Sequence, residues 1–276
     1  MITITNVETY GWEAAIRGMR NPMNSWDKSD SYFGEPYLED ENSYIESHIG
    51  QNDLDLMKRL RNAGTDHRKF MRMIIVSCDI IAPLYWWKEF KTYRAGRKFG
   101  DDEPTIIDII DEGYLEYDIE MNSCSTMHKI AEKEFTLDDF SYEHLIEETP
   151  EVLREWGVGV GWEDASHTIW PKDILEMTIE SLNNCREAYL KTKDKIYWWQ
   201  MIQLLPSSYE QKRTVMLNYE VLANMYKSRK NHKLDEWNTF CDWIEMLPYS
   251  ELITGMSYHD QIMKQIEEGK FLVEKK

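Results

Sequence analysis

The chain has 276 residues, of which 42% are hydrophobic and 13% aromatic, and its formal net charge is -18 at pH 7. A chain of this size can bury one large core, and no apolar run approaches the roughly 20 residues that span a bilayer. Binding of nucleic-acid polymers relies on cationic residues that displace counterions, so the acidic charge argues against such partners. A single nucleotide remains compatible, because a few local arginines and lysines suffice to hold one phosphate.

The start of the chain and its cysteines indicate a cellular location. Residues 1–8 alternate as a β-strand does and lack the basic stretch and apolar core of a signal peptide. The four cysteines are scattered without a C-x-x-C pair, and the seven histidines show no metal-ligand spacing. Neither a disulfide framework nor a metal site is therefore indicated. We expect a soluble cytoplasmic protein with reduced thiols.

Residues 52–63 place apolar side chains at helical spacing. We expect a helix there, with Asn52 or Asp53 as its N-cap and Gly64 as its stop signal.

A strand followed by a helix is expected next. Residues 70–81 are rich in Ile, Val, Met and Phe and predict a buried strand. Proline suits the first turn of a helix, so Pro83 predicts a helix that continues through Arg94. A strand that runs into a helix is a common geometry for a binding site.

The second half of the chain is predicted to be mainly helical, with helices at 171–193, 208–228 and 234–246. The glycines at 157–161 have no strand before them and lack the Lys-Ser/Thr of a phosphate loop, so we interpret them as a plain turn. No linker divides the sequence. We expect a single α+β domain over residues 1–276.

Three separated segments carry a more specific signal. Residues 81–94 read IAPLYWWKEFKTYR, residues 122–128 read NSCSTMH, and Leu205-Pro206 precedes NYEVLANMYKSR at 218–229. Together they resemble the signature of flavin-dependent thymidylate synthases. In that family a strand ending in Ala-Pro leads into R-Q-W-x-R-H-R, followed by N-E-x-S-x-R and later by L-P and N-x-R-S-x-x-[NH]-F-x-x-x-R. The ordered matches extend across roughly half of the chain.

The resemblance implies a fold, a reaction and an assembly. The fold is α+β, a small sheet packed with several long helices. Enzymes of the family are homotetramers that bind FAD and dUMP at subunit junctions. They take a methylene group from methylenetetrahydrofolate and use NADPH to reduce the flavin. The resemblance thus implies an FAD-dependent methyltransferase that converts dUMP to dTMP, with a pyrimidine deoxynucleotide as its partner.

It also implies roles for individual residues. Arg229 is the expected catalytic residue, since a cation beside a pyrimidine carbonyl stabilises the negative charge that develops as C5 becomes nucleophilic. Substrate binding is expected from Lys88, Glu89, Ser123, Ser125 and Arg229, with Ser125 near the nucleotide phosphate. Cofactor binding is expected from His67, Tyr93, Arg94, Asn122, Asn218, Asn224 and His232.

Several positions depart from the family pattern. The substituted residues are Glu89 for Gln, Thr92 for Arg, Tyr93 for His, Ser123 for Glu, Met127 for Arg and Glu220 for Arg. We expect Lys88, Lys91 or Lys129 to restore part of the lost positive charge, although lysine lacks the bidentate fork of arginine. Residues 97–121 are an insertion relative to the family.

Other functions remain open at this point. Altered ligands could select another pyrimidine nucleotide, for instance for hydroxymethylation, or leave a non-catalytic nucleotide-binding or assembly protein that keeps the fold. Cys124 and His128, four residues apart on a helix, could form a thiolate pair, which is the chemistry of the unrelated cysteine-dependent thymidylate synthases.

Purely structural roles are also open for these residues. The pairs Trp86-Trp87 and Trp198-Trp199 suit core or interface packing. Tyr93 could be a buried hydrogen-bonding side chain. The remaining structural alternatives are helix capping by Asn122 or Ser125 and closure of a helix C-terminus by Arg229.

Overall fold

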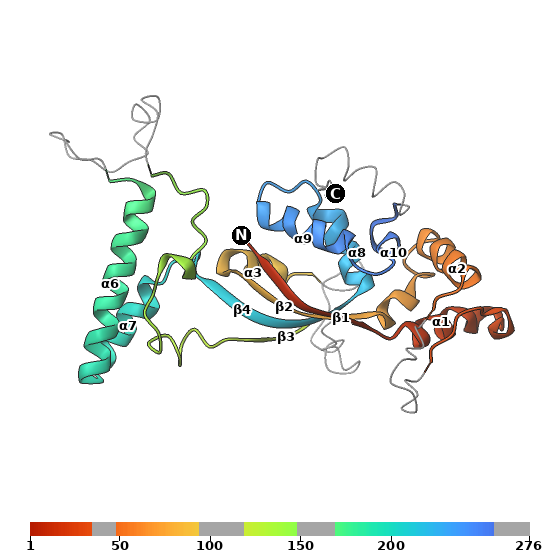
Figure 1. Ribbon diagram of the computed structural model, residues 1–276, viewed down its shortest axis with the longest axis horizontal. Helices are drawn as coiled ribbons and strands as arrows, with labels where there is room; N and C mark the ends of the chain where they lie inside the picture. Colours follow the sequence, from red (N-terminus) through yellow and green to blue (C-terminus); the bar gives the residue numbers. More distant parts are fainter. Residues whose placement is uncertain (35–47, 94–118, 148–168, 257–276) are drawn as a thin grey trace, which may run out of the picture. The chain divides into compact units, whose positions relative to one another are not determined.

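The computed structural model describes residues 1–34, 48–93, 119–147 and 169–256 (Figure 1). The strands are β1 (Thr3–Tyr10), β2 (Ile75–Pro83), β3 (Ile119–Ser123) and β4 (Glu210–Asn218). The α-helices are α1 (Trp12–Arg20), α2 (Gln51–Asn62), α3 (Leu84–Phe90), α6 (Pro171–Thr192), α7 (Lys195–Leu204), α8 (Tyr219–Arg229), α9 (Asp235–Glu245) and α10 (Glu251–Thr254). Short 3₁₀ segments lie at Asn21–Met23, Trp26–Lys28, Lys69–Met73 and Leu137–Asp139.

The four strands form one antiparallel sheet in the order β1-β2-β4-β3. The expected α+β class, a small sheet with several helices, is confirmed. In the described part of the chain, no helix combines the length and apolar character that a bilayer crossing requires.

The chain divides into two compact units. Unit 1 comprises Met1–Thr3, Ile80–Phe90 and Asn122–Arg213, and unit 2 comprises Ile4–Asp79, Lys91–Met121 and Thr214–Lys276. All four strands therefore pass from one unit into the other along the chain. The single domain over 1–276 stays a prediction, and the insertion at 97–121 lies almost entirely outside the described residues.

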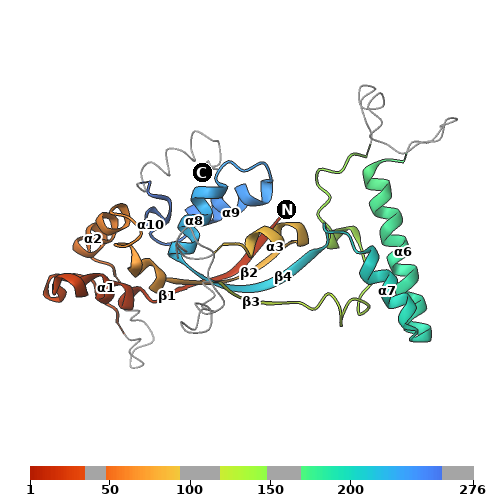
Figure 2. The ribbon, with the colours of Figure 1, turned by 180° about the vertical axis from the view of Figure 1, so that it is seen from behind.

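The core of unit 1 is formed where α6 and α7 lie side by side (Figure 1, Figure 2). Its buried side chains are Ile130, Ala131, Phe135, Phe140, Leu175, Ile179, Leu182 and Met201. Asn183 fastens the loop at Phe135 to α6, because its side-chain amide accepts from the Phe135 N–H and donates to the Phe135 carbonyl, both at 2.9 Å. The loop that follows β3 is thereby held against a long helix.

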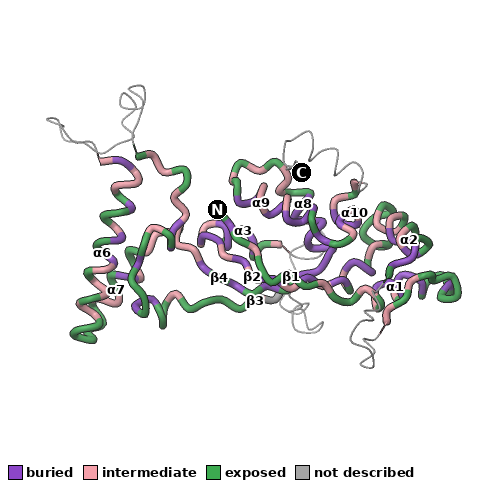
Figure 3. The backbone as a smooth tube through the Cα atoms, in the orientation of Figure 1, coloured by how far each residue is buried: buried purple, intermediate pink, exposed green. Residues whose placement is uncertain are grey.

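The core of unit 2 surrounds α8, which is buried along most of its length (Figure 3). Helix α9 packs against it with Trp237, Phe240 and Ile244 buried. The Tyr219 hydroxyl donates to the Pro248 carbonyl at 2.5 Å, and the ring meets Trp12 edge-on at 5.2 Å. Helix α8 is consequently a rigid support for the side chains at its two ends.

Two predicted helices are confirmed, and a third is correct only in its second half. The segments 171–193 and 234–246 are α6 and α9, but 208–228 is strand β4 followed by α8. Burial along β4 alternates from residue to residue, as in a strand. Three of its buried positions hold polar residues, Gln211, Arg213 and Asn218, and the first two hid the alternation in the sequence.

Arg213 tolerates burial because its charge has partners within unit 1. Its guanidinium carbon lies 4.3 Å from the centre of the Trp87 ring, and its Nη2 donates to Gln211 Oε1 at 2.7 Å. A cation on an aromatic face is stabilised by the ring quadrupole. The buried face of β4 therefore uses an arginine where an aliphatic residue is usual.

The helix predicted at 52–63 is α2, shifted by one residue, but its N-cap differs from the prediction. Gly50 precedes the helix, and the capping carboxylate comes from Asp30, which accepts from the N–H groups of Asn52 at 2.9 Å and Asp53 at 3.2 Å. A distant residue thus replaces the local cap. The stop is as expected, since Gly64 follows the helix with a φ of 110°.

The strand predicted at 70–81 begins later, at Ile75. The Met71 N–H bonds to the Arg68 carbonyl at 3.0 Å, which makes Lys69–Met73 a 3₁₀ turn before the strand. Helix α3 starts directly after Pro83 but ends at Phe90, short of Arg94, which lies outside the described residues together with the turn predicted at 157–161.

The two tryptophan pairs have different environments. Trp86 and Trp87 are fully buried, which confirms a core role for them. Trp198 is half-buried and donates to the Met127 carbonyl at 3.0 Å. Trp199 is 43% exposed, so it is not a core residue of this chain.

Candidate functional site

Helix α8 ends on Arg229, whose guanidinium packs against two aromatic rings. Its Cζ lies 4.8 Å from the centre of the Trp237 ring and 5.3 Å from that of the Tyr93 ring. Nε donates to the Tyr93 hydroxyl, and Nη1 lies 2.9 Å from Nε2 of His232. Three residues that the sequence predicts from separated positions, Tyr93, Arg229 and His232, therefore meet in one cluster.

The turn after α8 fixes the histidine of this cluster. The His232 N–H bonds to the Arg229 carbonyl at 3.0 Å, and the Leu234 N–H donates to His232 Nδ1 at 3.1 Å. A neutral imidazole with Nδ1 as acceptor carries its proton on Nε2. Each ring nitrogen of His232 therefore has one polar neighbour, Leu234 at Nδ1 and Arg229 at Nε2.

Arg229 Nη1 lies within hydrogen-bond distance of His232 Nε2, at 2.9 Å, and the tautomer of the imidazole sets the role of Nε2. The guanidinium is a donor in either case. The contact places the charge of Arg229 beside the imidazole at the end of α8.

A buried carboxylate lies at the other end of α8. Glu220 is 0% exposed, and its carboxylate accepts hydrogen bonds from Nε of Arg68 at 3.4 Å and from Nε of Arg72. Arg68 Nη2 also donates to Asn224 Oδ1 at 3.1 Å. Glu220 has a negative charge where the expected motif has an arginine. Two arginines from the segment before β2 pair with this charge.

The other expected cofactor residues of unit 2 have clear local roles. Asn218 is the N-cap of α8, its Oδ1 accepting from the Val221 N–H at 3.0 Å. His67 is exposed in the turn before the 3₁₀ segment, next to Arg68. Asn122 differs, since it belongs to unit 1 at the end of β3.

The expected phosphate residue Ser125 lines a pocket of about 710 Å³ in unit 1. Pockets of this size accommodate small molecules such as nucleotides. Ser125 Oγ accepts from the His128 N–H at 3.0 Å, which closes the turn after β3. Lys129 and Lys133 also line the pocket, but Lys129 pairs with Glu132 and Lys133 pairs with Asp139.

The remaining expected substrate residues are not gathered there. Lys88 is exposed and Glu89 half-buried on α3, and Ser123 is exposed at the end of β3. Within the described ranges, none of the three lines the Ser125 pocket. Arg229, the fifth, lies in unit 2.

The proposed Cys124–His128 pair required a helix, and this expectation is wrong. Cys124 lies in an extended segment and His128 in a turn closed by Ser125. The predicted pair relied on the helical spacing that makes residues four apart neighbours. A thiolate pair of that geometry is therefore not formed.

Sequence reasoning missed three members of these clusters. Trp237 was given no role at the site, although it is one of the rings against Arg229. Arg68 and Arg72 were not considered, although they lie four residues apart just after His67. The signal for them was Glu220, because a buried negative charge on α8 demands cations nearby.

Comparison with known proteins shows the fold of the chain. No protein-family model matches the chain, and no curated protein matches its sequence. Its structure, however, has the fold of the flavin-dependent thymidylate synthases. The expected family fold is therefore confirmed.

The structural likeness extends over nearly the full length of particular solved structures. Thymidylate synthase X (ThyX) from Helicobacter pylori, crystallised with FAD and dUMP, aligns with a TM-score of 0.54 at 15% identity, over 92% of this chain and 98% of that chain. A second complex of the Helicobacter pylori enzyme with FAD and dUMP gives a TM-score of 0.54 at 16% identity, over 91% and 99%. The UMP/dUMP methylase PolB from Streptomyces cacaoi aligns with a TM-score of 0.45 at 12% identity.

Proposed function

We propose that the protein is a flavin-dependent enzyme that binds a pyrimidine deoxynucleotide and transfers a one-carbon unit to C5 of the base. The observation that carries this proposal is the cluster of Tyr93, Arg229 and His232, which joins separate motif segments in a fold shared with a structure named for FAD and dUMP. The reaction proposed is reductive methylation of dUMP to dTMP, with methylenetetrahydrofolate as carbon donor and NADPH as reductant.

The chemistry at Arg229 supports the proposal. When C5 of a pyrimidine becomes nucleophilic, negative charge develops on the adjacent carbonyl. A fixed donor directed at such an oxygen typically lowers the free-energy barrier of the reaction by about 2.7–4 kcal/mol. Arg229 is held by Trp237 and Tyr93, so little reorganisation is needed when the charge appears. The C5 hydrogen leaves as a proton.

We propose that FAD is the cofactor and that residues of unit 2 contact it. His67, Tyr93, Asn218, Asn224 and His232 of the expected cofactor set all lie in this unit. Amide and imidazole groups donate to ring acceptors, and aromatic side chains pack against planar rings. FAD reduced by NADPH would supply the hydride that turns the transferred methylene group into a methyl group.

A second candidate is one-carbon modification, such as hydroxymethylation, of another pyrimidine nucleotide. It is favoured by the Ser125 pocket, where Lys129 and Lys133 each pair with a carboxylate and the phosphate environment is correspondingly less cationic than the family motif implies. A non-catalytic nucleotide-binding role is the third outcome of the test below.

The test is the visible spectrum of the purified protein, followed by calorimetric titration of dUMP, dCMP and dTMP into the FAD-loaded protein. We expect flavin absorbance that stays with the protein through gel filtration, and dUMP as the tightest ligand. Tighter binding of dCMP would support the second candidate. A colourless protein that takes up no added FAD would contradict both enzymatic functions.

Assembly offers a separate test. We propose a homotetramer, because the family that the sequence resembles completes its sites at subunit junctions. Sedimentation velocity at micromolar concentration should give four times the chain mass of 33.0 kDa. A monomer under these conditions would contradict a shared site.

A further inference from the structure

Two arginines of unit 2 pair with the buried Glu220, and a third, Arg61, lies near one of them. Arg68 and Arg72 bind its carboxylate from the segment between α2 and β2. Arg61, in the last turn of α2, donates to the Leu252 carbonyl at 3.2 Å and to the Ile253 carbonyl at 3.0 Å in α10. The whole chain carries a net charge of -18, so this concentration of cations is against its general trend.

The group at Glu220 carries more positive than negative charge. Two guanidinium groups, those of Arg68 and Arg72, pair with one carboxylate. Burial, and after it the positive charge of Arg68, lower the pKa of the Arg61 guanidinium, so a third cation lies near Arg68.

The side chains of Arg68 and Arg72 carry this positive charge to the protein surface. The Glu220 side chain is 0% exposed, whereas those of Arg68 and Arg72 are 17% and 35% exposed. The buried carboxylate binds the Nε atom of each arginine and so fixes the orientation of each guanidinium, part of which lies at the surface. Such preorganised guanidinium groups are well suited to phosphate oxygens.

We propose that Arg68 and Arg72, anchored by Glu220, bind a phosphate group of the dinucleotide cofactor. The cation that the family motif carries on α8 is thereby relocated to the segment before β2. The dinucleotide is the source of the phosphate because Asn224, bonded to Arg68, and His67, its neighbour in sequence, are both expected cofactor residues. This inference rests on the proposed function.

The test separates phosphate binding from simple neutralisation of Glu220. The dissociation constant for FAD is measured by flavin fluorescence for the parent, for Arg72→Gln and for the double variant Glu220→Gln/Arg72→Gln. Arg17→Gln is the matched control, since Arg17 lies in the same unit on α1 with its side chain 68% exposed. Thermal unfolding of each variant reports on the fold, and a dUMP titration reports on the other phosphate source.

We expect Arg72→Gln to weaken FAD binding about ten- to a hundredfold, the usual effect of losing one charge-assisted contact. The double variant should regain the parent's thermal stability but not its affinity, and Arg17→Gln should bind FAD as the parent does. Full recovery of affinity in the double variant, or a loss confined to dUMP, would overturn the inference while leaving the proposed function intact. A parent that binds neither FAD nor dUMP would contradict both.

Discussion

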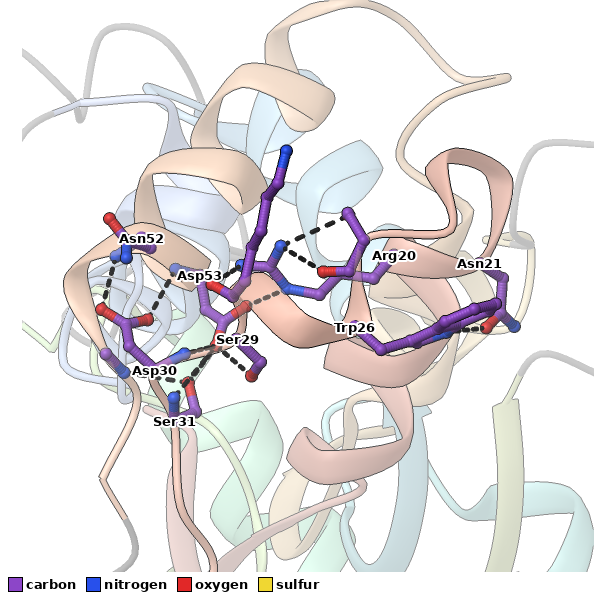
Figure 4. Close-up of polar contacts among 11 residues, drawn as sticks. Arg20, Asn21, Trp26, Ser29, Asp30, Ser31, Asn52 and Asp53 are labelled. Atoms are coloured by element: carbon purple, nitrogen blue, oxygen red, sulfur yellow. Dashed lines mark hydrogen bonds and ion pairs between the residues drawn. The ribbon is translucent and has the colours of Figure 1, made fainter.

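Replacing Asp53 by Asn should destabilise the fold far more than an isosteric change normally does. The Asp53 side chain is fully buried in α2, and its Oδ1 accepts from Arg20 Nε at 2.6 Å (Figure 4). Its Oδ2 accepts from the hydroxyls of Ser29 at 2.7 Å and Ser31 at 2.6 Å, and from the N–H groups of Asp30 and Ser31 at 3.2 and 3.1 Å. One carboxylate thus joins α1, the loop after it and α2.

The size of the effect follows from these contacts. An asparagine has one acceptor oxygen, so its NH₂ group would face either the guanidinium of Arg20 or the donors of the loop. The buried Arg20 would also lose its counter-charge. Removing one partner of a buried ion pair typically costs about 3–5 kcal/mol. We therefore expect Asp53→Asn to lower the free energy of unfolding by that amount.

The same carboxylate predicts a pH dependence. Burial raises the pKa of Asp53, but hydrogen bonds from Ser31, Ser29 and Arg20, with the charge of Arg20, outweigh it and lower the pKa below its usual value. A lowered pKa in the folded state means that the carboxylate stabilises the fold above its unfolded pKa, about 3.9. That contribution is lost as the pH falls through the lower, folded pKa. Asp53→Asn should remove this part of the acid sensitivity.

Urea unfolding monitored by tryptophan fluorescence measures both effects. Asp55→Asn is the matched control, because Asp55 lies on the same helix but is exposed and accepts a single bond from Gln51 at 2.8 Å. We expect the control to stay within about 0.5 kcal/mol of the parent. A loss below about 1 kcal/mol for Asp53→Asn, with an unchanged slope against urea, would refute the reasoning.

The remaining predictions concern Arg229, the Ser125 pocket and the turn at Gly11. Arg229→Ala should lower turnover about 10²–10³-fold with an unchanged circular dichroism spectrum, and turnover at the parent rate would exclude its catalytic role. Lys129→Ala should weaken dUMP binding about ten- to a hundredfold in calorimetry, because Lys129 lines the pocket of Ser125; unchanged affinity would exclude compensation by this lysine. Gly11→Ala should destabilise the protein by about 1–3 kcal/mol, because Gly11 has a φ of 83° and a Cβ there would lie 1.9 Å from the Met73 carbonyl oxygen. A thermal midpoint equal to that of the parent would contradict the last prediction.

The sequence predicted elements whose buried faces are apolar and failed where polar residues are buried. Helix α9 was recognisable because Trp237, Phe240 and Ile244 repeat at helical spacing and are all buried. Strand β4 was not, because Arg213 occupies a core position, where the Trp87 ring and Gln211 stabilise its charge. Contacts of that kind depend on residues far away in sequence, so no local pattern announces them.

The candidate site shows the same limit. The motif segments predicted Arg229 and His232, and the structure brings them together with Tyr93. The partners of Glu220 come from positions about 150 residues earlier, with sequence separations of 152 and 148. Spacing along α8 could not reveal them. Trp237 was visible as an apolar residue, but its position beside Arg229 depends on the turn that joins α8 to α9.

We propose that this chain performs flavin-dependent one-carbon transfer to a pyrimidine nucleotide. The most direct measurement is mass spectrometry of the nucleotide after incubation of the FAD-loaded protein with dUMP, methylenetetrahydrofolate and NADPH. We expect a product heavier than dUMP by one CH₂ unit, formed only when all components are present and lost in Arg229→Ala. Unchanged dUMP after prolonged incubation of protein that retains its flavin would contradict the claim.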